Sequence, residues 1–173
     1  MLITSSRKPS DSTRILCKKL AVFFDCHYMT RGKMSLSEVL EEGRENIILL
    51  VGEFHGNPGS LSFYGTDGSL YLSLHISQTS PSPLGTDELK KGQIGLSLSE
   101  NETSGDAERL YRVIADTVFE GFIPDTAGCG RLLTVSSDAL SFSVRGTVFL
   151  KLYIKGMKIY GTQENDAGQP TAE

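Results

Sequence analysis

The chain has 173 residues, of which 39 % are hydrophobic and 22 % are charged, and its formal net charge is −4. This length supports one sizeable domain or two small halves that share a core, and the composition is ordinary for a soluble globular protein. The longest apolar run, residues 47–51, is far too short to span a bilayer, and the start of the chain has no secretory pattern. Three cysteines without a Cys-x-x-Cys spacing indicate reduced thiols in a cytosolic protein.

Cations and acids are unevenly distributed along the chain. Residues 1–35 hold seven Lys or Arg and two Asp or Glu, whereas residues 36–130 hold five Lys or Arg and fifteen Asp or Glu. The acidic total argues against a nucleic-acid partner, but a local basic face directed at a polyanion would produce this asymmetry. Such asymmetry also arises often in acidic proteins without functional meaning, and the sequence leaves both interpretations open.

The first elements predict a strand that runs into a helix. Residues 2–4 are apolar or β-branched and predict a short strand, which Pro9 ends. Ser10 predicts the N-cap of a helix with one apolar face. The connection has two interpretations. It is a strand end plus a cap, or it is an anion site in which helix-start N–H groups, hydroxyls, Arg7 and Lys8 hold a phosphate.

The rest of the first half predicts one short helix and four strands. Ser35 and Glu38 form a capping-box pattern at the start of this helix, and Gly43 ends it. Turns are expected at residues 57–59 and at residues 66–68. The helix is predicted at residues 36–42, and the strands are predicted at residues 26–30, 47–53, 61–63 and 70–76.

Residues 78–92 have loop composition and predict the boundary between two halves. The second half is predicted to contain a strand, a helix, an acid-rich loop and three strands, at residues 94–98, 104–118, 120–130, 132–135, 139–144 and 148–154. In both halves a helix is followed by a strand, a turn, a second strand, another turn and a long strand of alternating residues. The alternative is that the halves are unrelated, because hairpins with alternating Leu and Phe look alike in many proteins. This pattern favours an α/β (α+β) unit that is internally duplicated. The expected divisions are residues 1–90, residues 91–160 and a disordered polar tail at residues 161–173.

No pattern in the sequence indicates catalysis, a metal centre or a bound cofactor. The three histidines, His27, His55 and His75, lack the spacing of metal ligands and are expected on the surface or half-buried. Cys17 lies beside the apolar helix face, which favours a buried, inert thiol. Neither a phosphate loop nor an ordered Ser, His and Asp set is present, so the sequence predicts a protein that is not an enzyme.

Several stretches resemble the Brix domain family, whose members are ribosome-biogenesis proteins that act on pre-ribosomal RNA. The resemblance is carried by residues 2–10 (Leu-Ile-Thr-Ser-Ser-Arg-Lys-Pro-Ser), the basic helix that follows, residues 28–32 (Tyr-Met-Thr-Arg-Gly), residues 35–38 (Ser-Leu-Ser-Glu) and the strand from Ile47. It is specific in the first third of the chain and rests on element order beyond it. It implies a duplicated unit in which each half is similar to the anticodon-binding domain of class IIa aminoacyl-tRNA synthetases. Near residues 142–145 the family often has more basic and aromatic residues, whereas this chain retains only Arg145.

The resemblance implies an rRNA-binding ribosome-biogenesis factor without catalysis, similar to a minimal archaeal member and therefore cytoplasmic. The expected partners are pre-rRNA or rRNA and ribosomal or assembly proteins, with no membrane, metal or cofactor. The expected RNA-binding residues are Thr4, Ser5, Ser6, Arg7, Lys8, Ser10, Arg14, Lys18, Arg31 and Lys33. Tyr28 is expected either to stack on a base or to pack in the core. The alternative function is a protein-binding scaffold whose acidic middle segment docks a basic ribosomal or assembly protein.

Overall fold

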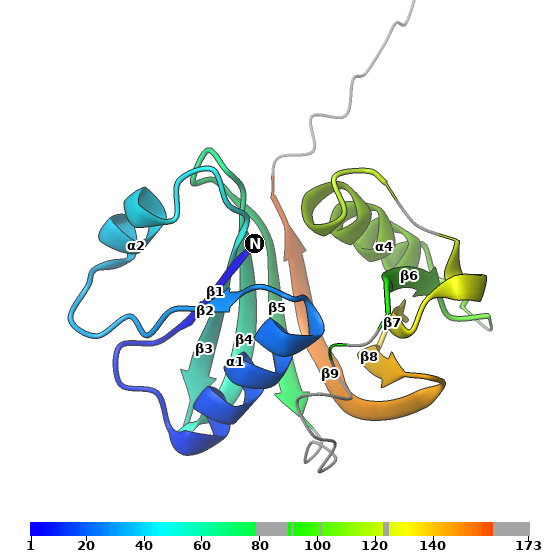
Figure 1. Ribbon diagram of the computed structural model, residues 1–173, viewed down its shortest axis with the longest axis horizontal. Helices are drawn as coiled ribbons and strands as arrows, with labels where there is room; N and C mark the ends of the chain where they lie inside the picture. The colour runs from blue at the N-terminus through cyan, green and yellow to red at the C-terminus, as the bar shows by residue number, and fades with distance from the viewer. Residues whose placement is uncertain (79–89, 91, 101, 123–124, 161–173) are drawn as a thin grey trace, which may run out of the picture.

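The strands of the protein form one nine-stranded sheet, as a computed structural model shows (Figure 1). The structure describes residues 1–78, 90, 92–100, 102–122 and 125–160. Its first elements are β1 (Leu2–Ser5), α1 (Asp11–Phe23), β2 (His27–Tyr28), α2 (Leu36–Glu42), β3 (Ile48–Phe54), β4 (Asn57–Tyr64) and β5 (Leu70–Gln78). The others are β6 (Ile94–Leu98), α4 (Gly105–Val118), a 3-10 turn η1 (Thr126–Gly128), β7 (Arg131–Val135), β8 (Ala139–Val144) and β9 (Thr147–Ile159). The chain is therefore a mixed α/β protein with one large sheet and few helices.

The strand order is β2-β1-β3-β4-β5-β9-β8-β7-β6. In the first set, β1 is parallel to β3, and the sheet continues antiparallel through β4 and β5. In the second set, β6 is parallel to β7, and the sheet continues antiparallel through β8 and β9. The two sets meet where β5 and β9 pair antiparallel, and this pairing joins them into a single sheet (Figure 1).

Local capping signals place both helices of the first set where the sequence predicts them. The side chain of Ser10 accepts a hydrogen bond from the backbone N–H of Thr13 at the start of α1. Ser35 and Glu38 complete the capping box of α2, and Gly43 is its C-cap. The helix predicted from Ser104 is also confirmed as α4, with Ser104 as its N-cap. These boundaries follow from short-range hydrogen bonds, which a sequence displays directly.

The turn predicted at residues 57–59 is wrong, because these residues begin β4. The chain instead reverses at His55 and Gly56, whose φ angles of 50° and 74° form a two-residue hairpin turn. The proline that follows is tolerated in β4 because the pairing of β3 with β4 shifts register between Gly52 and Glu53. An Asn-Pro-Gly sequence is a strong turn signal, but here tertiary pairing overrides it.

One face of the sheet is apolar and packs against the two long helices. Residues directly opposite each other on paired strands share a face, so the register places Leu49, Phe63 and Leu72 in one row. Leu16 and Leu20 of α1 and Leu110 and Ile114 of α4 belong to the same buried cluster as this row. The core therefore extends continuously across both sets of strands, and it fixes the position of α1 relative to β7 and β8.

Some predictions concern residues outside the described ones. The predicted boundary at residues 78–92 includes only Gln78, Lys90 and Gly92 among described residues, and the predicted tail at residues 161–173 lies wholly outside them. The strand predicted at residues 148–154 is longer in the structure. It continues to Ile159 because its second part pairs with β5 beyond the end of β8.

Candidate nucleic-acid interface

The connection between β1 and α1, for which an anion site is one of the two interpretations of the sequence, already holds an anion of the chain itself, the Glu53 carboxylate. The carboxylate of Glu53, near the end of β3, lies at the start of α1. Its Oε1 accepts hydrogen bonds of 2.7 Å from the backbone N–H of Ser10 and 2.7 Å from the hydroxyl of Thr13. Its Oε2 accepts a 3.0 Å hydrogen bond from the hydroxyl of Ser6. A negative charge at a helix N-terminus is stabilised by the free N–H groups and by the helix dipole.

The hydrogen bonds of Glu53 also decide its protonation state. Partial burial raises the pKa of this carboxyl group, but the hydrogen bonds from Ser10, Thr13 and Ser6 outweigh burial and lower the pKa to about 2. The group is therefore ionised at neutral pH. A phosphate at this position would have to displace a charged, fully engaged carboxylate, so the phosphate interpretation of the helix start does not fit this geometry.

The predicted hydroxyl contacts with RNA need correction for the same reason. Thr4 and Ser5 are completely buried, and the hydroxyl of Thr4 donates to the carbonyl oxygen of Met29 at 3.0 Å. Ser6 donates to Glu53, and the Ser10 hydroxyl accepts from the backbone N–H of Thr13 at 3.3 Å. These four side chains hold the protein together, and we leave them out of the interface proposed below.

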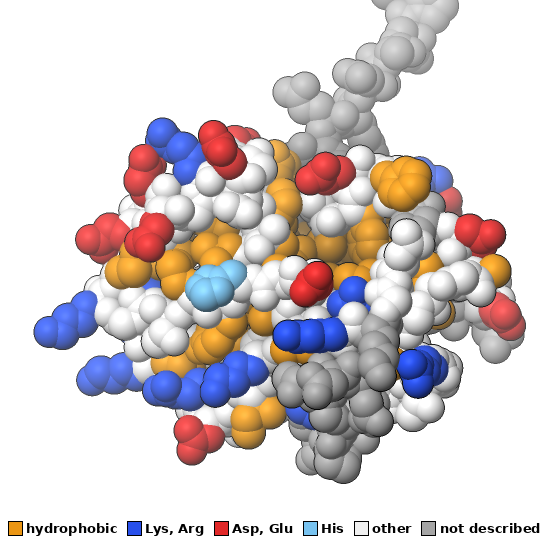
Figure 2. All heavy atoms as spheres, viewed as in Figure 1, with side chains coloured by type: hydrophobic (Ala, Val, Ile, Leu, Met, Phe, Trp, Pro, Cys, Tyr) orange, Lys and Arg blue, Asp and Glu red, His pale blue; other side chains and the backbone are white. Residues whose placement is uncertain are grey.

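The predicted cations, in contrast, are largely at the surface. Five are exposed and Arg31 is half-buried; the six are Arg7, Lys8, Arg14, Lys18, Arg31 and Lys33. Figure 2 shows Lys and Arg side chains gathered on one side of the molecule, over the β1–α1 connection, α1 and the β2–α2 connection. We call this set of six residues the N-terminal basic face.

Two arginines of the N-terminal basic face are anchored to the backbone. Nε of Arg14 donates to the carbonyl oxygen of Pro9 at 3.1 Å, and Nε of Arg31 donates to that of Met34 at 2.8 Å. These bonds hold the two guanidinium groups against the connections that carry the neighbouring cations.

Tyr28 is half-buried, with its hydroxyl 3.3 Å from that of Ser5, and it packs against the core cluster. The core-packing alternative for Tyr28 fits this position.

The described residues do not bring together three or more His, Cys, Asp or Glu side chains that could hold a metal ion. All three histidines are exposed.

Burial raises the pKa of the Cys17 thiol to about 12 and that of the Cys26 thiol to about 11. Neither thiol is ionised at neutral pH, so neither is prepared for nucleophilic attack. No helix of the described part of the chain is long and apolar enough to cross a membrane.

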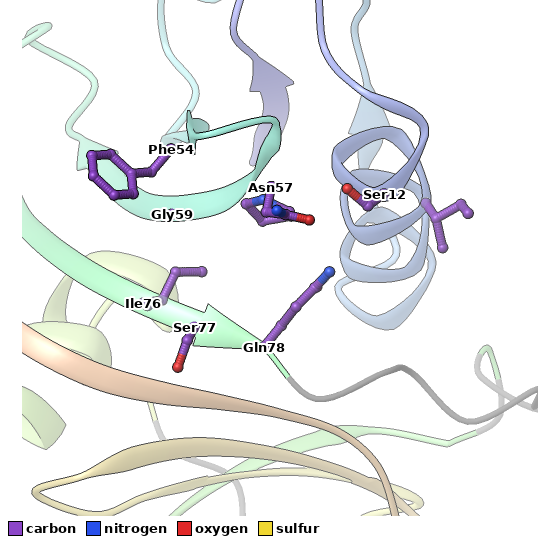
Figure 3. A pocket seen from close by; sticks show the side chains of 9 residues that line it. Ser12, Phe54, Asn57, Gly59, Ile76, Ser77 and Gln78 are labelled. Atoms are coloured by element: carbon purple, nitrogen blue, oxygen red, sulfur yellow. The ribbon is translucent and has the colours of Figure 1, made fainter.

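An apolar groove of about 560 Å³ lies between α1, the β3–β4 hairpin and the end of β5 (Figure 3). Phe54 and Ile15 line it, with 70 % and 48 % of their surface exposed. Ile76 and Gln78 of β5 also line it, and the side-chain oxygen of Gln78 is buried without a hydrogen-bond partner among the described residues. None of the described residues that line the groove is charged, which distinguishes it from the N-terminal basic face.

The sequence analysis did not predict two residues whose contacts hold α1 in place, Glu53 and Arg131. Glu53 contacts residues 40 to 47 positions away. Arg131 is buried and donates to the carbonyl oxygens of Gly92, Val22 and Phe23, the last of them 108 positions away. No local motif marks either residue, because their partners become neighbours only in the folded chain.

Comparison with known proteins identifies similar chains along most of the length. No family model matches the sequence. A Methanococcoides burtonii protein named as a probable Brix domain-containing ribosomal biogenesis protein is 38 % identical over 160 residues, which cover 91 % of this chain and 96 % of that protein. A Methanosarcina barkeri protein with the same name is 35 % identical, over 92 % of this chain and 100 % of its own length.

Two solved structures have the same fold. The crystal structure of Mil, an archaeal Imp4-like protein, has a TM-score of 0.68 and 24 % identity, and the match covers 92 % of this chain and 99 % of Mil. A probable ribosomal biogenesis protein from Aeropyrum pernix has a TM-score of 0.66 and 21 % identity, over 88 % of this chain and 93 % of its own.

Proposed function

This chain belongs to the Brix domain family of ribosomal biogenesis proteins, and we propose that it serves ribosome assembly by binding rRNA or pre-rRNA without catalysing a reaction. Its place of action is then the cytoplasm, where archaeal ribosomes are assembled, and ribosomal or assembly proteins are further partners. The chain contacts RNA through the cations of the N-terminal basic face and needs no cofactor.

The observation that carries the proposal is the N-terminal basic face. Its cations gather on one side of a protein whose net charge is −4 (Figure 2). Lys and Arg side chains that neutralise phosphates release condensed counterions, and this release supplies much of the affinity of a protein for RNA. Phosphate contacts position a protein on RNA without reading the sequence. The face therefore fits a general contact with the rRNA backbone, to which other contacts add specificity.

We further infer that the chain consists of two duplicated units, residues 1–90 and 91–160, each similar to the anticodon-binding domain of class IIa aminoacyl-tRNA synthetases. The support is that β1, α1, β3, β4 and β5 have the same order and strand pairing as β6, α4, β7, β8 and β9. Superposition of the two sets tests this inference. If β3 and β7 do not coincide when the helices are aligned, the duplication is wrong.

Binding of the full chain to an rRNA fragment at increasing salt tests the RNA assignment. The logarithm of the affinity should fall linearly with the logarithm of the salt concentration, with a slope of roughly −0.7 to −0.9 per phosphate engaged. The alternative is a scaffold whose acidic middle segment docks a basic protein. Salt-independent or absent RNA binding, together with binding of a basic ribosomal protein, would favour that scaffold.

A further inference from the structure

The sheet has a second face, opposite the apolar one, and much of its part on β5, β8 and β9 is polar. Strand register places Ser77 beside Tyr153 and Ser73 beside Lys158 on this face. Further along it, Thr134, Ser141 and Lys151 form a row across β7, β8 and β9. All of these side chains are half-buried or exposed, whereas Leu72, Leu140 and Leu152 on the apolar face are buried. We call the part of this face on β5, β8 and β9 the polar sheet face; its members are Ser73, His75, Ser77, Ser141, Lys151, Tyr153, Lys155 and Lys158.

The charge of this surface contrasts with that of the chain. The protein has 21 Asp and Glu residues, yet β4, β5, β8 and β9 contain none, and β9 alone carries three lysines. Among the described residues, three carboxylates lie near the face, and one of them, Asp106 of α4, lines a groove with Lys155 and Lys158. A hydrogen bond from the Ser136 hydroxyl lowers the pKa of Asp138, and the positive charges of Lys151 and Lys155 lower it further. Glu53 lines a neighbouring groove with His75 and Lys155, but both of its oxygens already accept hydrogen bonds.

The aromatic and cationic side chains of β9 are arranged together. Nζ of Lys151 lies 5.0 Å and Nζ of Lys155 lies 5.8 Å from the ring centre of Tyr153, one on each side along the strand. Nζ of Lys158 lies 4.9 Å from the ring centre of Tyr160. Cation–π contacts of this kind hold lysine ammonium groups near an aromatic ring at low entropic cost. An open sheet that presents a tyrosine between lysines matches the surfaces on which single-stranded RNA stacks its bases and places its phosphates.

We propose that the polar sheet face binds a single-stranded segment of RNA, with a base stacked on Tyr153 and phosphates at Lys155 and Lys158. This inference rests on the proposed function and adds to it a second contact, on β9, beyond the N-terminal basic face. The positive lysines in an acid-free part of the sheet supply the charge complementarity for a polyanion. The tyrosine and the surrounding hydroxyls favour RNA over a polyanion without bases, because bases stack and the ribose 2′-hydroxyl both donates and accepts hydrogen bonds.

The test measures binding of the full chain to an unstructured oligouridine by fluorescence anisotropy at several salt concentrations. The double variant Lys155→Glu/Lys158→Glu should bind at least tenfold more weakly, and its salt slope should be shallower by about 1.4, because two phosphate contacts of about 0.7 each are lost. The control Arg44→Glu/Lys90→Glu changes the net charge equally at exposed positions outside the face. Its affinity should stay within about twofold of that of the unchanged chain if local contacts dominate.

Variants at Tyr153 separate stacking from charge. Tyr153→Leu should weaken oligouridine binding by about fivefold or more with an unchanged salt slope, whereas Tyr153→Phe keeps the ring and should bind nearly as the unchanged chain does. Thermal unfolding of each variant checks that the fold is retained.

Three results would overturn the inference. Unchanged oligouridine affinity in Lys155→Glu/Lys158→Glu, with loss in Arg7→Glu/Lys8→Glu, would confine RNA binding to the N-terminal basic face and leave the proposed function intact. If Lys155→Glu/Lys158→Glu weakens the binding of oligouridine and of a poly-glutamate peptide by equal factors, the polar sheet face binds polyanions in general rather than RNA. Absence of RNA binding by the unchanged chain would overturn the proposed function itself.

Discussion

Nη1 of Arg131 donates a 2.5 Å hydrogen bond to the carbonyl oxygen of Phe23, the last residue of α1, across 108 positions of the sequence. The same nitrogen lies 3.3 Å from the carbonyl oxygen of Val22, and Nε and Nη2 donate to Gly92. The last carbonyl groups of a helix lack partners within it and carry partial negative charge, which a cation stabilises. The last turn of α1 has no basic residue, so β7 supplies the cation from the second half of the chain.

Glu53 has the complementary position at the other end of the same helix. Its carboxylate accepts hydrogen bonds from Ser10 and Thr13 at the N-terminus of α1, while the guanidinium of Arg131 meets the C-terminus. Both helix ends are thus satisfied by residues of opposite charge from distant strands. This arrangement fixes α1, and with it the cations that α1 contributes to the N-terminal basic face.

Replacement of the Glu53 carboxylate should destabilise the protein. In Glu53→Gln the new amide nitrogen cannot accept from Ser6, Ser10 or Thr13, so at least one donor loses its partner. We expect the free energy of unfolding to fall by roughly 1–3 kcal/mol. Urea denaturation measures this loss, and the exposed Glu42→Gln in α2 is the control, expected within about 0.5 kcal/mol of the unchanged chain. A loss at Glu53 no larger than at Glu42 would contradict the prediction.

The stabilisation by Glu53 should depend on pH. Its pKa is lowered from the ordinary glutamate value of 4.5 to about 2 in the folded protein, because hydrogen bonds outweigh the opposing effect of burial. Below the pKa of the unfolded state, 4.5, the unfolded chain binds more protons at Glu53 than the folded chain does. The stabilisation of the fold by Glu53 is therefore complete above pH 4.5 and declines as the pH falls towards 2. The difference in unfolding free energy between the unchanged chain and Glu53→Gln should therefore narrow from pH 5 to pH 3.

Other carboxyl groups with lowered pKa values, such as Glu102 and Asp67, also lose stabilisation in acid. Their effects cancel when the two chains are compared at each pH. A constant difference across this range would show that the Glu53 charge does not stabilise the fold.

Loss of the Arg131 guanidinium should cost more than loss of an exposed arginine. Arg131→Met keeps an apolar side chain of similar reach but leaves the buried carbonyl oxygen of Phe23, and the carbonyl oxygen of Gly92, without this donor. Hydrogen bonds with a charged partner contribute about 1.5–3 kcal/mol, so we expect a decrease of about 2–3 kcal/mol in unfolding free energy. Arg112→Met is the control, because Arg112 is exposed and, among the described residues, its ion pair is with Glu108 one helical turn away. Such a pair contributes about 0.3–0.5 kcal/mol, and equal losses for the two variants would refute the role of Arg131.

Charge reversal on the N-terminal basic face should weaken RNA binding broadly. Arg7 and Lys8 are both exposed, and Arg7→Glu/Lys8→Glu should lower the affinity for different RNA sequences by similar factors, since phosphate contacts do not read bases. The salt slope should become shallower, while stability stays within about 0.5 kcal/mol per substitution. Filter binding with two unrelated rRNA fragments measures both effects. A loss confined to one fragment would mean that these residues read sequence or shape.

The sequence determined those features that depend on short-range contacts. Ser35, Glu38 and Gly43 set the limits of α2 because each bonds within one turn of its neighbours. Alternation of apolar and polar residues in β5 and β9 marked the strands, since side chains of a strand point to opposite faces. The uneven distribution of cations along the chain also suggested a basic face, as one of two open interpretations, before the fold was known.

Tertiary structure decided how the residues between these elements are used. The sequence suggests Thr4, Ser5, Ser6 and Ser10 as phosphate ligands, but folding buries the first two and brings Glu53 to the hydroxyl of Ser6 and the backbone N–H of Ser10. Asn57-Pro58-Gly59 read as a turn, but pairing with β3 makes it strand. In each case the deciding partner lies on another element, and the free energy of burying and satisfying a polar group depends on neighbours that only the folded chain assembles.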